Sequence, residues 1–213
     1  MRRSIWLAVG IVVLAPLLEA QVAPGKFLIA HRSLLDPNFT RTVVLMVRYG
    51  EDGAMGLIVN RQTKIPLSRA LDGLKDAKSR SDPVYLGGPV EVGGVVALVR
   101  SRAKPEDARH VFADVYLLSS KASLERALAA GAESSALRAY LGYSGWGAGQ
   151  LEHEIELGSW LVWRGDPATV FDPDPETVWS RLIQKTEARI AVLRKPPPEP
   201  QGRGSRYGWD LRP

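Results

Sequence analysis

The sequence predicts one mixed α/β domain whose strands are joined mainly by hairpins. Short apolar runs alternate with amphipathic stretches, and turn-forming residues separate neighbouring runs. Hydrophobic residues form 45% of the 213-residue chain and charged residues 24%, proportions that argue against wholesale disorder and against a polytopic membrane protein. A doubly wound parallel sheet is disfavoured, because helices rather than hairpins would connect its strands.

The two ends of the chain differ from the segment between them. Residues 1–20 have a basic start, an uncharged apolar stretch at 5–18 and a small residue at Ala20, as a secretory signal peptide has. The stretch is shorter than the roughly 18 residues of a spanning helix, which favours a cleaved signal over a retained anchor, a misassigned start or a buried helix. Residues 194–213 are basic and rich in proline and glycine, so we expect a disordered tail. One domain remains, at 24–193.

The net charge of +5 belongs mostly to these ends. Residues 1–20 carry +1 of it and residues 194–213 carry +3, which leaves about +1 on the domain. Nucleic-acid binding is therefore not expected, since it needs clustered lysine and arginine. The absence of cysteine excludes lipid attachment at a thiol and is compatible with an oxidising compartment.

The first half of the domain is expected to consist of strands and turns. Runs such as VVLMV lack polar alternation, which indicates strands covered on both faces. In chain order we expect a strand at 26–30, a turn at 36–39, a hairpin of strands 41–48 and 54–60 around the loop 49–53, a helix at 67–74 and a polar loop at 75–83.

The second half brings more helix. Ser120 or Ser123 is a candidate N-cap for a helix that ends near Gly131. The segment 137–143 is ambiguous between helix and strand, and a strand is favoured because glycines follow it. The other expected elements are strands at 84–86, 94–100, 111–119 and 160–163 and helices at 149–157 and 176–193.

Six blocks of sequence together resemble the bacterial YqgE/AlgH family across 25–190. They are GKFLIAH at 25–31, DPNFTRTVVLMV at 36–47, GAMGLIVNR at 53–61, VYLGGPV at 84–90, LGYSGWGAGQLEHEI at 141–155 and GSWLV at 158–162. The resemblance implies a compact single-domain α+β fold, built on mixed β-sheet with hairpins and flanking short helices. It implies no established biochemical function, although some members carry the label of transcriptional regulator. Members usually lack the leader and the basic tail, which argues against a cytoplasmic or DNA-linked role here.

The block GYSGW comes within one residue of the G-x-S-x-G nucleophile elbow of serine hydrolases. Trp146 stands where the closing glycine is needed, and His153 follows Ser144 by only nine residues, so we expect a structural turn. The glycines before the next helix suggest an anion site at its N-terminus, but Gln150 breaks the dinucleotide spacing and a tight turn is preferred.

Acidic residues and histidine on the helix 149–157 raise the question of a metal. Successive helical side chains point about 100° apart, so they cannot converge on one ion, and a solvated face opposite Leu151 and Ile155 is expected instead. No metal and no cofactor is predicted. The residues considered were Glu152, His153, Glu154 and Glu156, with His31 and His110 interpreted as isolated strand-end residues.

A candidate binding groove follows from the family blocks. Pro89 is expected to push Gly88 out of the helical region while Gly87 takes a positive φ, which makes a forced bend. If the blocks gather in space, aromatic walls and amide donors would line one groove. Its predicted residues are Asn60, Gly87, Gly88, Pro89, Tyr143, Trp146, Gln150 and Glu154.

These observations favour a non-enzymatic, exported and periplasmic protein that binds or regulates an unknown protein or small ligand. Membrane contact is expected only through residues 5–18, if the leader is uncleaved. The competing hypotheses are a cytoplasmic transcriptional regulator and, behind it, a hydrolase-like enzyme. The sequence predicts no oligomeric state.

Overall fold

The structure is a computed structural model that describes residues 21–194. The predicted signal peptide and, apart from Arg194, the predicted tail lie outside the described residues. The strands are β1 (Lys26–Ala30), β2 (Val43–Gly50), β3 (Gly53–Ile58), β4 (Gln62–Pro66), β5 (Pro83–Leu86), β6 (Val90–Arg100), β7 (Arg109–Phe112), β8 (Val115–Leu118), β9 (Leu137–Trp146) and β10 (Trp160–Arg164). The helices are α1 (Leu67–Ala70), the single 3-10 turn η2 (Lys75–Ala77), α2 (Lys121–Ala129), α3 (Gln150–Glu156), α4 (Pro167–Val170) and α5 (Pro175–Arg194).

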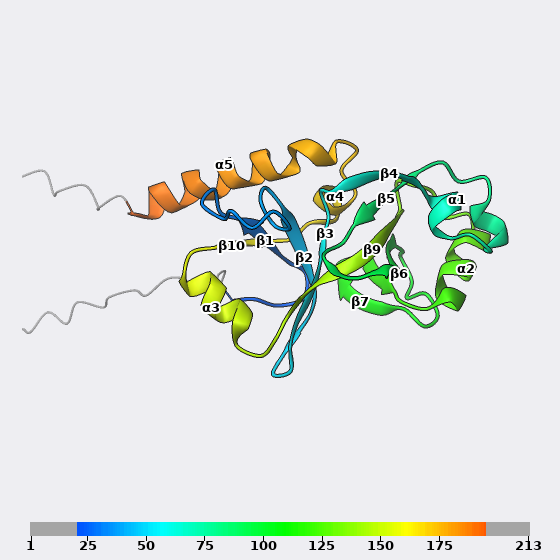
Figure 1. The fold of residues 1–213 in the computed structure, drawn as a ribbon, viewed down its shortest axis with the longest axis horizontal. Helices are drawn as coiled ribbons and strands as arrows, with labels where there is room; N and C mark the ends of the chain where they lie inside the picture. The colour runs from blue at the N-terminus through cyan, green and yellow to red at the C-terminus, as the bar shows by residue number, and fades with distance from the viewer. Residues whose placement is uncertain (1–20, 195–213) are drawn as a thin grey trace, which may run out of the picture.

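The fold is α+β, as the family resemblance implies (Figure 1). The strands follow the order β10-β1-β2-β3-β9-β6-β8-β7, and β4 and β5 attach beside β9. β5 and β9 run parallel while the other paired strands are antiparallel, so the sheet is mixed. Among residues 21–194, no helix has the length and apolar character needed to cross a membrane.

Strand β9 holds the two halves of the sheet together. It pairs with β6 along much of its length, with β5 at Tyr140 and with β3 at Trp146. The favoured strand therefore forms, but it extends through the GYSGW block, and the expected turn there is wrong. Every second residue from Arg138 to Trp146 is buried. This two-residue period is typical of a strand, and it continues across the glycines of the block.

Both faces of the β1–β3 region are covered, as the unbroken apolar runs predict. Helix α5 lies along one face and α3 lies against the other (Figure 1). Under α5 the core includes Phe27, Leu45 and Ile183, whereas Met46 and Leu151 belong to the core under α3. A further apolar cluster packs under α1 and α2 at the other end of the molecule.

Helix starts follow the expected chemistry. Ser120, not Ser123, caps α2, and the two side chains form a reciprocal capping box. Asp166 caps α4, in which Pro167 occupies the first helical position. Helix α4 has no counterpart among the predicted elements, because four residues are too few to show a helical period.

Several predicted boundaries are wrong. The strand expected at 111–119 is a hairpin, β7–β8, that turns at Ala113 with φ 45°. A single alanine with positive φ is not a turn signal that sequence reveals. The helix expected at 67–74 stops at Ala70, η2 occupies part of the expected polar loop 75–83, and β4 was not predicted.

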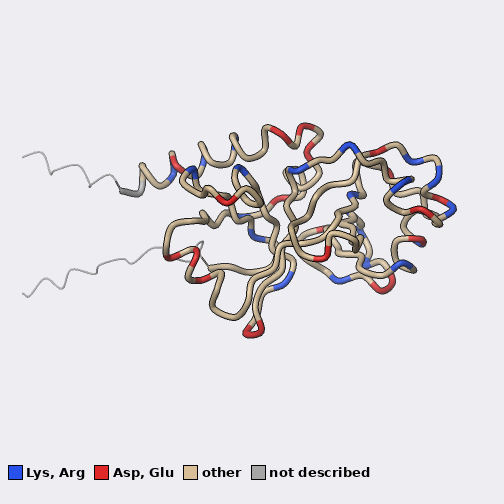
Figure 2. The backbone as a smooth tube through the Cα atoms, viewed as in Figure 1, with Lys and Arg blue, Asp and Glu red and all other residues tan. Residues whose placement is uncertain are grey.

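Charges of both signs are interspersed along the backbone in the view of Figure 2. The tip of the β2–β3 hairpin is acidic, at Glu51 and Asp52. In this view lysine and arginine do not gather into the broad basic face that a nucleic-acid partner requires.

Candidate functional site

The glycine and aromatic block after β9 forms a hydrogen-bonded frame around one carboxylate. Glu154 Oε2 accepts the indole N–H groups of Trp146 at 2.9 Å and of Trp160 at 2.8 Å. Glu154 Oε1 accepts the Gln150 amide at 2.9 Å, and Gln150 Oε1 accepts the Gly147 backbone N–H at 3.1 Å. The two tryptophans are 5% and 2% exposed, so their N–H groups need this acceptor. The network fastens α3 to the end of β9.

Glu152 and Glu154 are therefore not part of the solvated face that was predicted, whereas His153 and Glu156 are exposed as expected. Glu152 Oε1 accepts the Tyr49 hydroxyl at 2.6 Å, and this hydrogen bond raises the pKa of Tyr49. The ring of Phe39 stacks on Trp146, with centroids 6.0 Å apart. The prediction failed because helical periodicity shows which side chains share a face, but not that indole donors lie beneath that face.

Gly87 and Gly88 lie where the β5–β6 connection passes against β9. A Cβ on Gly88 would overlap the backbone of Tyr143 and Ser144, so glycine is required for this close approach. The positive φ predicted for Gly87 is wrong, since that residue is absent from the positive-φ glycines of the described chain. Pro89 is exposed beside the bend.

Ser144 is in no position to act as a nucleophile. Its side chain is fully buried inside β9, and its hydroxyl donates to the Gly87 carbonyl at 3.0 Å. His153 is exposed on α3. Within residues 21–194 no group of three or more histidine and carboxylate side chains could hold a metal ion. His31 bonds Ser33 at 2.8 Å, and His110 lies 3.0 Å from the Ala113 carbonyl.

Asn60 joins the connection after β3 to the start of β2. Its Oδ1 accepts the Val43 N–H at 2.7 Å, and its Nδ2 donates to the Arg41 carbonyl at 3.0 Å. The structure thus brings Trp146, Gln150 and Glu154 into one network, while Asn60 is engaged separately. That the eight predicted residues line one groove stays a prediction. The polar side-chain groups of four of them serve contacts within the fold, namely Asn60, Trp146, Gln150 and Glu154.

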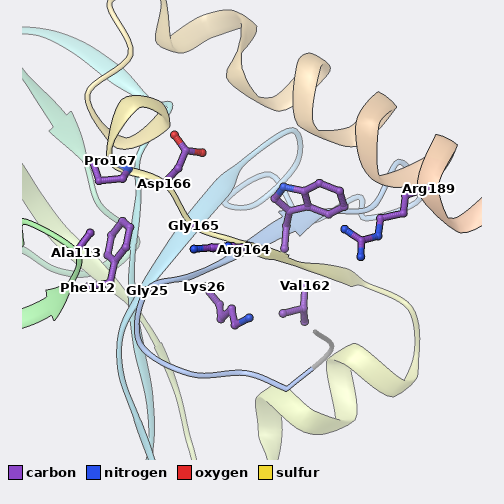
Figure 3. A pocket seen from close by; sticks show the side chains of 11 residues that line it. Gly25, Lys26, Phe112, Ala113, Val162, Arg164, Gly165, Asp166, Pro167 and Arg189 are labelled. Carbon is purple, nitrogen blue, oxygen red and sulfur yellow. The ribbon is translucent and has the colours of Figure 1, made fainter. Parts of the chain in front are cut away.

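A different hollow, which we call the β10 groove, lies along the outer strand of the sheet (Figure 3). Its volume is about 970 Å³. Residues from β1, the β7–β8 turn, β10, α4 and α5 surround it. They are Gly25, Lys26, Phe112, Ala113, Val162, Trp163, Arg164, Gly165, Asp166, Pro167 and Arg189.

Two cations face each other across the β1–β10 pair at this groove. Lys26 and Arg164 are direct cross-strand partners, so their side chains leave the sheet on the same face. Neither side chain has a hydrogen-bond or ion-pair partner within residues 21–194. Like charges directly opposite each other destabilise a sheet, so this pair favours an anion from outside the fold.

Two further charged side chains, Arg189 and Asp166, line the groove. The Arg189 guanidinium lies 5.5 Å from the centre of the Trp163 ring, a cation–π contact between α5 and β10. Trp163 and Arg189 lie on the α5 face of the sheet, whereas the side chains of Lys26 and Arg164 leave it on the α3 face, because neighbouring residues of a strand point to opposite faces. Figure 3 shows Lys26 and Arg189 on either side of β10. Asp166 also lines the groove and carries a negative charge, but within residues 21–194 it forms no ion pair with these cations. Its two carboxylate oxygens accept the N–H and hydroxyl of Thr169, each at 2.8 Å.

A second hollow, of about 660 Å³, lies beside the buried Arg138. The Arg138 guanidinium donates to the carbonyls of Val170 and Asp172 and lies 4.6 Å from the centre of the Tyr85 ring. Burial raises the pKa of Asp172, but the hydrogen bond from Arg181, a backbone N–H and two positive charges outweigh it, so the net shift is downward. Arg138 is satisfied here by groups of the fold itself.

The residues of the β10 groove escaped sequence reasoning. They come from five separate elements, and the GSWLV block ends just before Trp163 and Arg164. The strands at 26–30 and 160–163 were predicted, but their antiparallel partnership was not. Only that pairing places Lys26 opposite Arg164.

The AlgH-like family model matches residues 27–191. A UPF0301 protein of Chlorobium limicola is 36% identical over 182 residues, which cover 84% of this chain and 95% of that protein. A UPF0301 protein of Streptomyces avermitilis is 35% identical, with 85% of this chain and 96% of that protein covered. The solution structure of AlgH from Pseudomonas aeruginosa is 32% identical and has a TM-score of 0.64, covering 83% of this chain and 97% of that one.

A crystal structure from Corynebacterium diphtheriae has a TM-score of 0.67 at 23% identity, over 78% of this chain and 87% of that one, and supports the fold alone. None of these names states a biochemical activity. The matched region contains both the Glu154 network and nearly all of the β10 groove, with Gly25 and Lys26 just before it. By the extent of the family match and the identity to its relatives, this chain belongs to the AlgH-like family, the YqgE/AlgH family that its ordered blocks resemble.

Proposed function

We propose that this protein is a non-enzymatic, exported binding protein that recognises an anionic group in the β10 groove. The observation that carries the proposal is the Lys26–Arg164 pair, two cross-strand cations on one face of the sheet that have no ion-pair partner within residues 21–194. A bound anion would contact both cations and relieve their repulsion. Arg189 lines the groove from the other face of the sheet, where it lies over Trp163.

The groove also has the mixed lining of a binding site. Apolar and aromatic surface comes from Phe112, Val162 and Trp163. The charges of Lys26 and Arg164 would orient a bound ligand. The surroundings of Ser144, the candidate nucleophile, support a non-enzymatic role. Its side chain is buried, and its hydroxyl donates to the backbone carbonyl of Gly87.

Binding is tested with a pair of probes of similar shape. Naphthalenesulfonate carries the charge that the groove favours, and naphthalenemethanol lacks it. Titration followed by backbone amide NMR should show the sulfonate shifting the amides of Lys26, Val162 and Arg164, with much weaker effects from the alcohol. Arg164→Glu should abolish the sulfonate shifts.

The matched control is Arg69→Glu, which reverses an exposed charge on α1, at the other end of the molecule (Figure 1). This variant should bind the sulfonate as the parent protein does. Equal binding of both probes, or equal loss in both variants, would contradict an anion site at the β10 groove.

Export is tested separately, by fractionation and by sequencing the mature N-terminus. The leader at 1–20 predicts a periplasmic protein that begins at Gln21. A full-length protein in the cytoplasm would contradict export and favour the regulator hypothesis.

A further inference from the structure

The β10 groove runs along a free edge of the sheet. Among the strands of residues 21–194, β10 is the last in the strand order and pairs only with β1. Its sequence, WLVWR, is apolar and aromatic except for the final arginine, and its register with β1 is continuous. Native proteins usually protect such an edge with charges, proline or a bulge, because its backbone groups can pair with another chain.

The hydrogen-bond register shows which backbone groups of β10 are available. The His31 N–H donates to Ser159 O, and the Gly165 N–H donates to Gly25 O. In an antiparallel pair, hydrogen-bonded and non-hydrogen-bonded positions alternate. Leu161 and Trp163 therefore bond β1, and the N–H and C=O groups of Trp160, Val162 and Arg164 point away from the sheet.

These outward backbone N–H and C=O groups have no hydrogen-bond partner within residues 21–194. Val162 and Arg164 also line the β10 groove. The groove thus offers a row of outward backbone donors and acceptors along the edge of the sheet. The cationic pair lies on the α3 face of this edge, and the Trp163 ring beneath Arg189 lies on the α5 face.

Resting on the function proposed above, we infer that the anionic group belongs to an extended acidic peptide segment, which adds to β10 as a further strand. Its backbone bonds the N–H and C=O groups of Val162 and its neighbours. An acidic side chain of the segment lies between Lys26 and Arg164. Strand addition of this kind takes affinity from the main chain and specificity from side chains at alternate positions.

Charge decides between this partner and other occupants of the edge. A second copy would present its own β10, in which the sole charged residue is Arg164, so it brings no acid to the cationic pair. The C-terminal residues 194–213 carry five basic and two acidic residues, so they are a poor complement to the groove. An acidic partner neutralises Lys26 and Arg164 together.

The experiment uses labelled peptides of about seven residues, an ordinary strand length. One alternates valine with glutamate, the second has lysine in place of each glutamate, and the third is the glutamate peptide with N-methyl groups on alternate backbone amides. Fluorescence anisotropy should show binding of the glutamate peptide alone. Arg164→Glu should lower the affinity for the glutamate peptide at least about tenfold and allow the lysine peptide to bind, whereas Arg69→Glu should change neither affinity.

Val162→Pro tests the backbone part of the inference. Proline removes an N–H that points away from β1, and edge strands tolerate proline at such positions, so the fold should persist by circular dichroism. The variant should bind the glutamate peptide with an affinity about tenfold lower or more. Its affinity for naphthalenesulfonate should fall much less, because that probe forms no backbone pairing with β10.

Each remaining outcome is decisive. Binding of naphthalenesulfonate without any peptide, or equal binding of the N-methylated peptide, would overturn strand addition and leave the anion site standing. Failure of all probes would overturn both proposals. A concentration-dependent dimer that Val162→Pro dissociates would assign the edge to a second copy instead.

Discussion

Replacing Glu154 by alanine should strongly destabilise the fold, because one carboxylate satisfies two buried indoles. Glu154 accepts the N–H groups of Trp146 and Trp160, which are 5% and 2% exposed, and it also accepts the Gln150 amide. Leaving a buried donor unpaired costs about 1–3 kcal/mol. Two such donors, with partial relief from water entering at the half-exposed helix, give an expected loss of about 3 kcal/mol.

The assay is urea unfolding followed by tryptophan fluorescence. The unfolding free energy should fall by about 3 kcal/mol, while its slope against urea concentration stays unchanged. In a thermal melt the same loss would lower the melting temperature by roughly 6–12 °C for a domain of this size. The matched control is Glu156→Ala on the same helix, where the side chain is exposed and the change should stay within about 0.5 kcal/mol. Equal stability of the two variants would refute the view that Glu154 holds α3 to the sheet.

Three further predictions concern stability. Gly88→Ala should cost about 3 kcal/mol in urea unfolding, because the added methyl overlaps the backbone of β9, and a neutral result would contradict that close approach. Ser120→Ala should cost about 1 kcal/mol by loss of the α2 cap, measured by thermal melting, and no change would mean that the cap contributes nothing. Burial raises the pKa of Tyr140 above its ordinary value of 10.0, so its neutral form stabilises the fold below that pH and the stabilisation is lost as pH rises further. Unfolding free energies measured from about pH 8 to 11 should therefore fall less steeply in Tyr140→Phe than in the parent, and parallel slopes would count against this burial.

Sequence reasoning predicted the elements whose burial pattern is strong. The strands β1, β2, β3 and β10 and the helices α3 and α5 form close to their expected bounds, because each has a clear apolar run or period. The β7–β8 hairpin and α4 were missed, since Ala113 and a four-residue helix leave no such pattern.

The candidate site was harder to predict, for a reason of geometry. The conspicuous residues Trp146, Gln150 and Glu154 are close in sequence, and their contacts are local. Lys26 and Arg164 are inconspicuous in sequence and become neighbours only through strand pairing between the two ends of the domain. Spacing along the chain reveals the first kind of cluster, and only the sheet register reveals the second.

Amide hydrogen exchange along β10 tests the central claim most directly. In the free protein Leu161 and Trp163 should exchange slowly, because they bond β1, while Val162 and Arg164 exchange quickly. With the glutamate peptide bound, Val162 and Arg164 should slow at least about tenfold and Leu161 should remain slow. Exchange at Val162 and Arg164 that is already slow in the free protein, or unchanged by the bound peptide, would contradict the account.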